Sequence, residues 1–154
     1  MTELLHSPEI SQTTLCVAHP YRREDAAGWI GSHGADAEAG TSLNWAICDR
    51  ANGALIGAIS LEATPYHRRG MLGYWLGAPS WNRVVMSEAA RAVADYAFTD
   101  CRPHRAQATC MSHNVDSSRV MERAGLPCEG TLRGYYRKGD GFLDAGMYAL
   151  VHED

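Results

Sequence analysis

The chain has 154 residues, which is enough for one domain with a single hydrophobic core. Hydrophobic residues make up 45% of the sequence and charged residues 21%, as in ordinary globular proteins. The formal net charge of −4 excludes the basic footprint that nucleic-acid binding needs, and no apolar run approaches the roughly 20 residues that span a membrane. We therefore expect one domain over residues 1–154 whose partners include neither nucleic acid nor membrane.

The cysteines and the start of the sequence indicate the compartment. The cysteines are scattered along the chain as Cys16, Cys48, Cys101, Cys110 and Cys128. An odd, scattered set in a domain of this size predicts free thiols and a reducing compartment. The first residues contain acids and no apolar segment of the signal-peptide type. The expected location is therefore cytoplasmic.

Two helices are predicted before the first strand. Residues 3–10 can form a short helix, although Pro8 shortens it. Residues 22–32 place charge in a first turn and apolar side chains behind it, which predicts a second helix. Gly31 and Gly34 are expected to help end that helix.

Three strands are predicted next, because the hydrophobic period changes. Residues 42–50 alternate as a strand, and residues 54–63 form a second one. Asn52 and Gly53 lie between them, and this dipeptide is a strong hairpin signal. Residues 70–78 form the third strand.

The second half of the chain alternates helices and strands. Helices are predicted over 86–99 and 116–124 with a strand over 104–111 between them, followed by a hairpin of residues 130–138 and 141–151. The early strands are linked by a hairpin, while later ones are separated by helices. This order predicts a mixed sheet with helices on its faces, in the α+β or α/β class.

Two segments together carry a resemblance to a known family. The first is "LGYWLG" followed by "SEAARAVADYAF", and the second is "HNVDSSRVMERAGLPCEGTLRGYYRKGDGFLDAGMYAL". They resemble the GNAT acetyltransferase superfamily, in particular its branch of ribosomal-protein N-terminal acetyltransferases of the Rim type. The tail pattern of that branch is Asn-x-x-Ser-x-Arg-Val-x-Glu-x-x-Gly-Phe, followed by Glu-Gly. It is matched here by Asn114, Ser117, Arg119, Val120, Glu122, Gly125, Leu126 in place of Phe, Glu129 and Gly130.

The resemblance implies a fold and a reaction. The fold is a GNAT-like mixed, mostly antiparallel central sheet flanked by helices, and here its usual first strand is apparently missing. That loss would leave an unpaired sheet edge, which a partner chain could cover as a homodimer. The reaction is transfer of an acetyl group from acetyl-CoA to a primary amine, on a protein N-terminus or a small molecule, by direct attack without a covalent enzyme intermediate.

The resemblance also assigns residues to the cofactor. Tyr74, Trp75 and Leu76 would offer backbone groups to the pantetheine arm. Asn114 would form a hydrogen bond with the cofactor, and the Ser117 hydroxyl would lie near its sulfur. Asn114 could instead form a turn, and Ser117 could instead cap its helix.

The diphosphate would lie at the start of the helix near Val84 or Val85, where free N–H groups and the helix dipole favour negative charge. The contacting turn would comprise Asn82, Arg83, Val84, Val85, Met86 and Ser87. The family has glycines at the positions of Asn82 and Val84. Asn82 tolerates a left-handed backbone and Arg83 offers a phosphate partner, but Val84 is stiff and bulky. We therefore expect weakened coenzyme A binding.

Two carboxylates that are usual in the branch are replaced, by Met71 at the start of the third predicted strand and by Gly134. An amine acceptor must lose a proton, so a base is needed. Glu62 is the nearest acidic substitute, although a solvated strand residue is the simpler interpretation. Tyr136 and Ser117 could assist the departing thiolate, and Tyr136 could instead be a packing aromatic.

Other interpretations stay open. The altered turn and the replaced carboxylates also suit a catalytically impaired GNAT-fold binding or regulatory domain. A weaker option is transfer of a different acyl group, since Met71 and Met86 could shape an apolar cleft. Cys101 with His104, and Cys110 with His113, have the spacing of zinc ligands, but we expect incidental roles and no metal.

Overall fold

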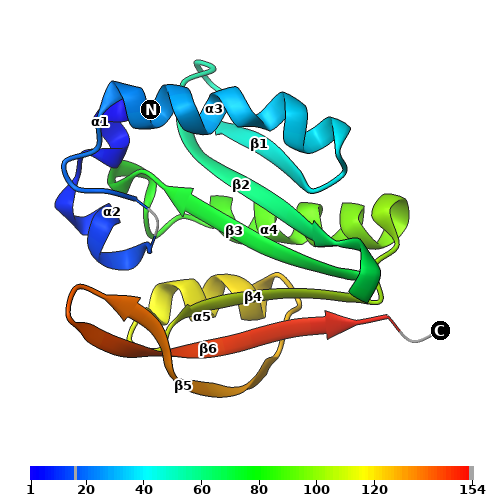
Figure 1. The fold of residues 1–154 in the computed structure, drawn as a ribbon. Helices are drawn as coiled ribbons and strands as arrows, with labels where there is room; N and C mark the ends of the chain where they lie inside the picture. Colours follow the sequence, from blue (N-terminus) through cyan, green and yellow to red (C-terminus); the bar gives the residue numbers. More distant parts are fainter. Residues whose placement is uncertain (16, 153–154) are drawn as a thin grey trace.

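The computed structural model describes residues 1–15 and 17–152. A six-stranded sheet runs through the molecule in the order β1-β2-β3-β4-β6-β5 (Figure 1). The strands are β1 (Ser42–Cys48), β2 (Leu55–Thr64), β3 (Arg69–Leu76), β4 (Arg105–Met111), β5 (Cys128–Lys138) and β6 (Gly141–Val151). The helices are α1 (Thr2–Leu5), α2 (Pro8–Thr13), α3 (Arg23–Glu38), α4 (Val85–Tyr96) and α5 (Val115–Arg123). Among the strand pairs of the described residues only β3 and β4 are parallel, so the predicted mixed, mostly antiparallel sheet with flanking helices is confirmed.

The helices before the sheet differ from the sequence prediction. The segment 3–10 forms two short helices, because Pro8 occupies the first turn of α2 and cannot continue α1. The predicted end of the next helix near Gly31 and Gly34 is wrong, since α3 continues to Glu38. Glycine weakens an exposed helix by about 1 kcal/mol but does not stop it. The chain turns only after the helix, where Gly40 adopts a φ of 67°.

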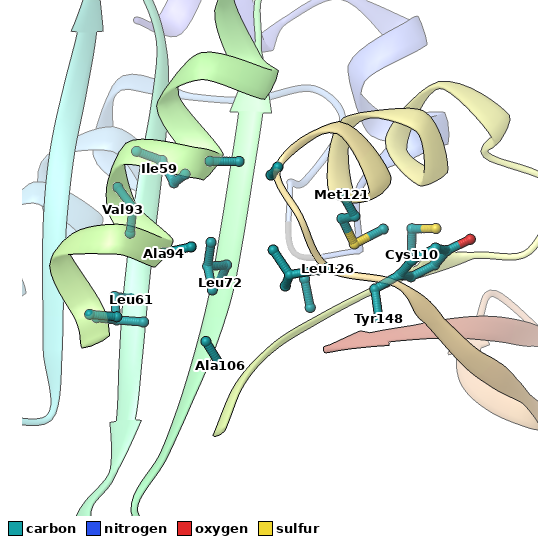
Figure 2. Close-up of a cluster of buried hydrophobic side chains, with 14 residues drawn as sticks. Ile59, Leu61, Leu72, Val93, Ala94, Ala106, Cys110, Met121, Leu126 and Tyr148 are labelled. Carbon is teal, nitrogen blue, oxygen red and sulfur yellow. The ribbon is translucent and has the colours of Figure 1, made fainter. Parts of the chain in front are cut away.

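Apolar side chains on the two faces of the sheet form two separate hydrophobic clusters. On one face of the sheet, Ile59, Leu61 and Leu72 pack with α4 and α5 in the main core (Figure 2). On the opposite face, Ala58 and Trp75 join a smaller cluster with the N-terminal helices. Successive strand residues point to opposite faces, so each strand contributes to both clusters.

The parallel pair β3–β4 opens toward its carboxyl end. Its register runs from Arg69 opposite Arg105 only as far as Leu72 opposite Ala108. Beyond that point β3 continues to Leu76 and β4 to Met111 without pairing to each other. Helices α4 and α5 begin shortly after these two strands end (Figure 1). The splay therefore opens a space between two strand ends and two helix starts.

The outer strand β1 lies at one edge of the sheet. It is antiparallel to β2, with Ser42 opposite Glu62 at one end of the register. Within residues 1–15 and 17–152 no strand lies on its other side. Helix α3 runs along β1 on one face of the sheet (Figure 1).

Candidate functional site

A cavity of about 310 Å³ lies at the splayed end of β3. Its walls come from α2, the end of β3, the turn before α4, the first turn of α4, and one face of α5 along its length. The sequence-predicted site residues that line it are Tyr74, Trp75, Leu76, Asn82, Arg83, Met86, Ser87, Asn114 and Ser117. The fold thus brings together residues that are up to 43 positions apart in the chain.

A hydrogen-bonded chain joins the two sides of the splay. The phenol of Tyr74 on β3 lies 2.7 Å from the Ser117 Oγ on α5, and the Ser117 N–H donates to the Asn114 Oδ1 at 3.1 Å. Asn114 is therefore the N-cap of α5, and Ser117 is not. Burial raises the pKa of Tyr74 far above its usual range, so the phenol stays a neutral hydrogen-bonding group.

The turn before α4 accommodates its bulky residues without closing the cavity. Asn82 has a φ of 59°, the left-handed conformation that a glycine would adopt most easily. The side chain of Val84 is 58% exposed, and neither Val84 nor Val85 lines the cavity. Val84 is the N-cap of α4 and supplies no side-chain cap bond, so the first-turn N–H groups remain available to a ligand.

The charges lining the cavity favour an anion. Three guanidinium groups, of Arg83, Arg119 and Arg123, line it together with one carboxylate, of Asp116. Asp116 and Arg119 form an exposed ion pair at 3.4 Å. Sequence reasoning assigned no role to Arg119 and Arg123. Because they are four residues apart on a helix, they lie on one face of α5, and this spacing is the sequence feature that could have identified them as a pair.

One wall of the cavity is the end of α2, which is held from the hairpin β5–β6. The Lys138 ammonium donates to the carbonyl oxygens of Ser11, Gln12 and Thr14 at 2.6, 2.9 and 3.0 Å. Burial lowers the pKa of Lys138. Thr13 and Thr14 line the cavity, so this lysine fixes a wall that sequence reasoning did not identify.

Two residues predicted as catalytic lie outside this cavity. Glu62 lines a second cavity between α3 and the sheet, where it is the cross-strand neighbour of Met71. Tyr136 is half-buried on β5, and its hydroxyl forms a hydrogen bond with the Thr109 hydroxyl.

The structure shows Cys48, Cys101, Cys110 and Cys128 as free thiols. Among the described residues, no group of three or more His, Cys, Asp or Glu side chains is arranged to hold a metal ion. No helix in the part of the chain that the structure describes is long and apolar enough to cross a membrane.

Comparison with protein families gives a match over most of the chain. Residues 1–127 match the family model described as an acetyltransferase (GNAT) domain. An uncharacterized N-acetyltransferase YnaD from Bacillus subtilis is 36% identical over 81 residues, which cover 52% of this chain and 48% of that protein. A probable N-acetyltransferase YjcK from the same organism is 35% identical over 83 residues, covering 54% and 46%. The chain spans about half the length of these relatives.

Solved structures share the fold at low sequence identity. The microcin C7 self-immunity acetyltransferase MccE, solved with acetyl-CoA and AMP, has a TM-score of 0.86 and 19% identity over 98% of this chain and 84% of that one. RimL, a ribosomal L7/L12 alpha-N-protein acetyltransferase solved with coenzyme A, has a TM-score of 0.86 and 18% identity over 97% and 85%. At this identity the likeness extends to the fold alone.

Proposed function

Since the chain belongs to the GNAT acetyltransferase domain family, we propose that it transfers an acetyl group from acetyl-CoA to a primary amine by direct attack. The observation that carries this proposal is the cavity that joins the open end of the β3–β4 pair to the first turn of α4. A cofactor whose diphosphate and thioester lie at opposite ends of a long pantetheine arm suits that shape and charge.

The residues of the cavity fit such a cofactor. The first-turn N–H groups of α4, with Arg83 beside them, would hold the diphosphate. The unpaired end of β3, Tyr74 to Leu76, would offer backbone groups to the pantetheine arm. Asn114 and Ser117 would lie near the sulfur end, although Asn114 already uses its Oδ1 as a helix cap. The left-handed Asn82 and the outward Val84 support retained binding over the weakened binding expected from the sequence.

The bound cofactor supplies a thioester carbonyl carbon that an amine nitrogen can attack. The new C–N bond forms as the C–S bond breaks, and the sulfur leaves as a thiolate that takes up a proton. In this proposal the Ser117 hydroxyl, held by Tyr74, donates toward that sulfur. Glu62 accepts the proton from the amine, because it lies cross-strand from Met71, the position where the branch usually carries glutamate. The hydrogen bond of Tyr136 to Thr109 supports a packing role for Tyr136 over a catalytic one.

The proposal also includes the cellular location and the oligomeric state of the protein. The free thiols support a cytoplasmic location. The edge of β1 that no strand covers within residues 1–15 and 17–152 supports a homodimer or pairing with another segment. The acceptor in this proposal is either a protein N-terminus, the class that RimL's name gives, or a small molecule.

The second candidate function is a GNAT-fold binding or regulatory domain without catalysis. The observation that favours it is Met71, which cannot accept a proton at the strand position where the branch usually carries glutamate. Under this alternative the turn before α4 binds the cofactor weakly or not at all. Changing Asn82 and Val84 to glycine should then create a cofactor affinity that the parent protein lacks.

Calorimetry with acetyl-CoA and the full chain separates the two candidates. We expect saturable binding that Arg83→Gln weakens several-fold, whereas Arg91→Gln, the same change at an exposed position of α4, leaves it unaltered. Val84→Gly should change the affinity less than twofold, because the Val84 side chain does not line the cavity. No heat at millimolar acetyl-CoA would reject the acetyltransferase, and binding without thiol release in the presence of amines would favour the non-catalytic domain.

A further inference from the structure

The edge strand β1, Ser42–Cys48, has a sequence that does not prevent pairing with another strand. It reads SLNWAIC, with no charged residue and no proline. Natural edge strands usually carry such residues, because their free N–H and C=O groups can pair with another chain. Within residues 1–15 and 17–152, β1 pairs only with β2, and its register shifts only at its end, between Ile47 and Cys48. This regular, unprotected edge therefore indicates a surface that another strand covers.

Helix α3, beside this edge, carries a stripe of exposed residues with a particular order of charges. The residues of this α3 stripe recur at helical spacing and share one face of the helix: Arg23, Ala27, Ile30, Gly34 and Glu38. The side chain of Ile30 is 54% exposed. The space beside Gly34 is open, since a side chain at that position would meet no atom within 4 Å. The stripe thus has a positive end, a middle of small and apolar residues, and a negative end.

The α3 stripe points away from the rest of the molecule. On the sheet side of the helix, Ala26 packs in the hydrophobic cluster with Ala58 and Trp75. Ser32 lines the second cavity, which extends over β2 and β3, so its flank of the helix faces the interior of the sheet. At about 100° of rotation per residue, the middle of the stripe lies on the flank opposite to Ser32. The stripe therefore points outward past β1, which runs beside α3 (Figure 1).

The charges at the two ends of α3 are unfavourable within a single chain. Arg23 is the first residue of the helix and Glu38 is the last. The helix dipole favours negative charge at the start and positive charge at the end, so both side chains oppose it. The helix between them is about 22 Å long, too long for an ion pair, and neither forms an ion pair elsewhere in the described part of the chain. A second α3 running in the opposite direction would pair both charges.

A single two-fold axis can serve both the strand and the stripe. In an antiparallel pair of α3 helices, Arg23 lies opposite Glu38 of the partner subunit when the axis passes near Ile30. In an antiparallel pair of β1 strands, the axis passes near Trp45, the middle residue of the strand. Ile30 lies about 12 Å before the end of α3, and Trp45 lies about 10 Å after the start of β1. Because the chain reverses between the two elements, one axis can pass near both residues.

We propose that the chain forms a homodimer in which β1 pairs with the partner's β1 and the two α3 helices pack antiparallel over the joined sheets. Arg23 forms an ion pair with Glu38 of the partner subunit, twice in each dimer. The small residues Ala27 and Gly34 lie opposite each other across the axis and let the helices approach closely. The occupant is a second copy of this chain, because the stripe is complementary to itself. This inference assigns the homodimer of the proposed function to one surface, and it does not depend on acetyl transfer.

The test is the mass of the full chain in solution, measured by light scattering after size-exclusion chromatography at about 1–100 µM, where we expect a dimer. Arg23→Glu alone and Glu38→Arg alone should each weaken dimerisation about tenfold or more, because each places two like-charged pairs in the interface. Combining the two changes should restore the dimer, since opposite charges face each other again. Arg91→Glu, the same change at an exposed position of α4, should have no effect.

The charge reversals separate the interface from the fold. Both single changes agree with the dipole of α3, so neither should lower the melting temperature of the monomer. Hydrogen exchange at low and high protein concentration adds a readout for the strand. We expect the amides of residues 42–48 to exchange more slowly as the dimer forms and faster again in Arg23→Glu, because the outward N–H groups of β1 are bonded only in the dimer.

Other results would overturn the inference. A monomer at about 100 µM would reject the dimer. A dimer that both single reversals leave intact, or that the double change does not restore, would reject this surface. Slow exchange of residues 42–48 in a particle with the mass of one chain would mean that another segment of the same chain covers β1. A dimer that binds no acetyl-CoA would reject the proposed function and leave the interface standing.

Discussion

Among the contacts of single residues, the hydrogen bond between Tyr74 and Ser117 links β3 to α5 across the splay of the sheet. The two oxygens lie 2.7 Å apart, and both residues line the first cavity, which is the proposed acetyl-CoA cleft. The phenol also donates to the backbone carbonyl of Ser117 at 3.2 Å, so it keeps an acceptor when the Ser117 hydroxyl is removed, whereas removal of the phenol takes this partner from the partly buried Ser117 hydroxyl.

We predict that Tyr74→Phe lowers the free energy of unfolding by about 1–2 kcal/mol. Ser117→Ala should cost less, because the phenol keeps the Ser117 carbonyl as an acceptor, and the double variant should cost little more than Tyr74→Phe alone, because both changes remove the bond between the two hydroxyls. Urea denaturation of the four proteins measures this coupling. Additive losses would show that the phenol and the hydroxyl do not interact in solution.

The ion pair of Arg105 with Glu129 predicts a dependence of stability on pH. The hydrogen bond from Arg105 lowers the pKa of Glu129 in the folded state. The pair therefore stabilises the fold at pH values above the unfolded pKa of the carboxyl group, and this contribution is lost as the pH falls through the lowered folded pKa. Both side chains are partly exposed, so the effect should not exceed about 1 kcal/mol.

We predict that Glu129→Gln lowers the unfolding free energy at pH 7 and has a smaller effect at pH 3. Urea denaturation at both pH values provides the measurement. In an Arg105→Gln background the pH-dependent part should vanish, and an equal loss at both pH values would contradict the assignment.

For single residues, the sequence predicted the backbone conformation of Asn82 correctly but did not predict the direction of the Val84 side chain. The tolerance of Asn82 for a left-handed conformation is a property of the residue itself, and the structure confirms it with a φ of 59°. The direction of the Val84 side chain depends on how the turn enters α4, which no local pattern contains. The expected obstruction at Val84 therefore finds no support in the cavity lining.

At the scale of elements, the end of α2 depends on a lysine that is more than a hundred residues away. Lys138 satisfies three carbonyl oxygens where the short helix ends, and that segment forms a wall of the cleft. A six-residue helix has little stability of its own, so a distant contact must hold it.

We predict that Lys138→Met speeds amide exchange in residues 10–15 and weakens acetyl-CoA binding several-fold, because the wall becomes mobile while the hydrophobic stem is kept. Arg137→Met, on the exposed neighbour in β5, serves as the control and should leave both quantities unchanged. Hydrogen exchange with mass spectrometry resolves the segment. Unchanged exchange in Lys138→Met would show that α2 is held by its apolar contacts alone.

Elements were predictable where the hydrophobic period was strong. The strands and the helices α4 and α5 were found within a few residues of their bounds, since each places one regular apolar face on the core. Helix α3 was misjudged, because it buries almost nothing and its glycines resembled a stop signal. The Lys138 contact had no sequence signal at all.

For the molecule as a whole, stability depends on the core between the sheet and the helices α4 and α5. Leu126 follows α5 and is 1% exposed in the main cluster. We predict that Leu126→Ala lowers the unfolding free energy by about 2–5 kcal/mol, through lost burial and a new cavity. Val115→Ala, at a position that is 53% exposed, should change it by less than about 0.5 kcal/mol. Urea denaturation compares the two, and a small effect at Leu126 would mean that this core readily repacks.

The sequence by itself determined the order of the elements, the class of the sheet and the family, because periodicity, turn residues and the tail pattern are local properties of the chain. Only the tertiary structure decided which candidates meet. It grouped Tyr74, Asn82, Arg83 and Ser117 around one cavity and placed Glu62 in another, together with His33. The physical reason is that the splay of β3 from β4 and the position of α3 over the sheet result from packing between segments far apart in the chain. No local sequence pattern encodes that packing.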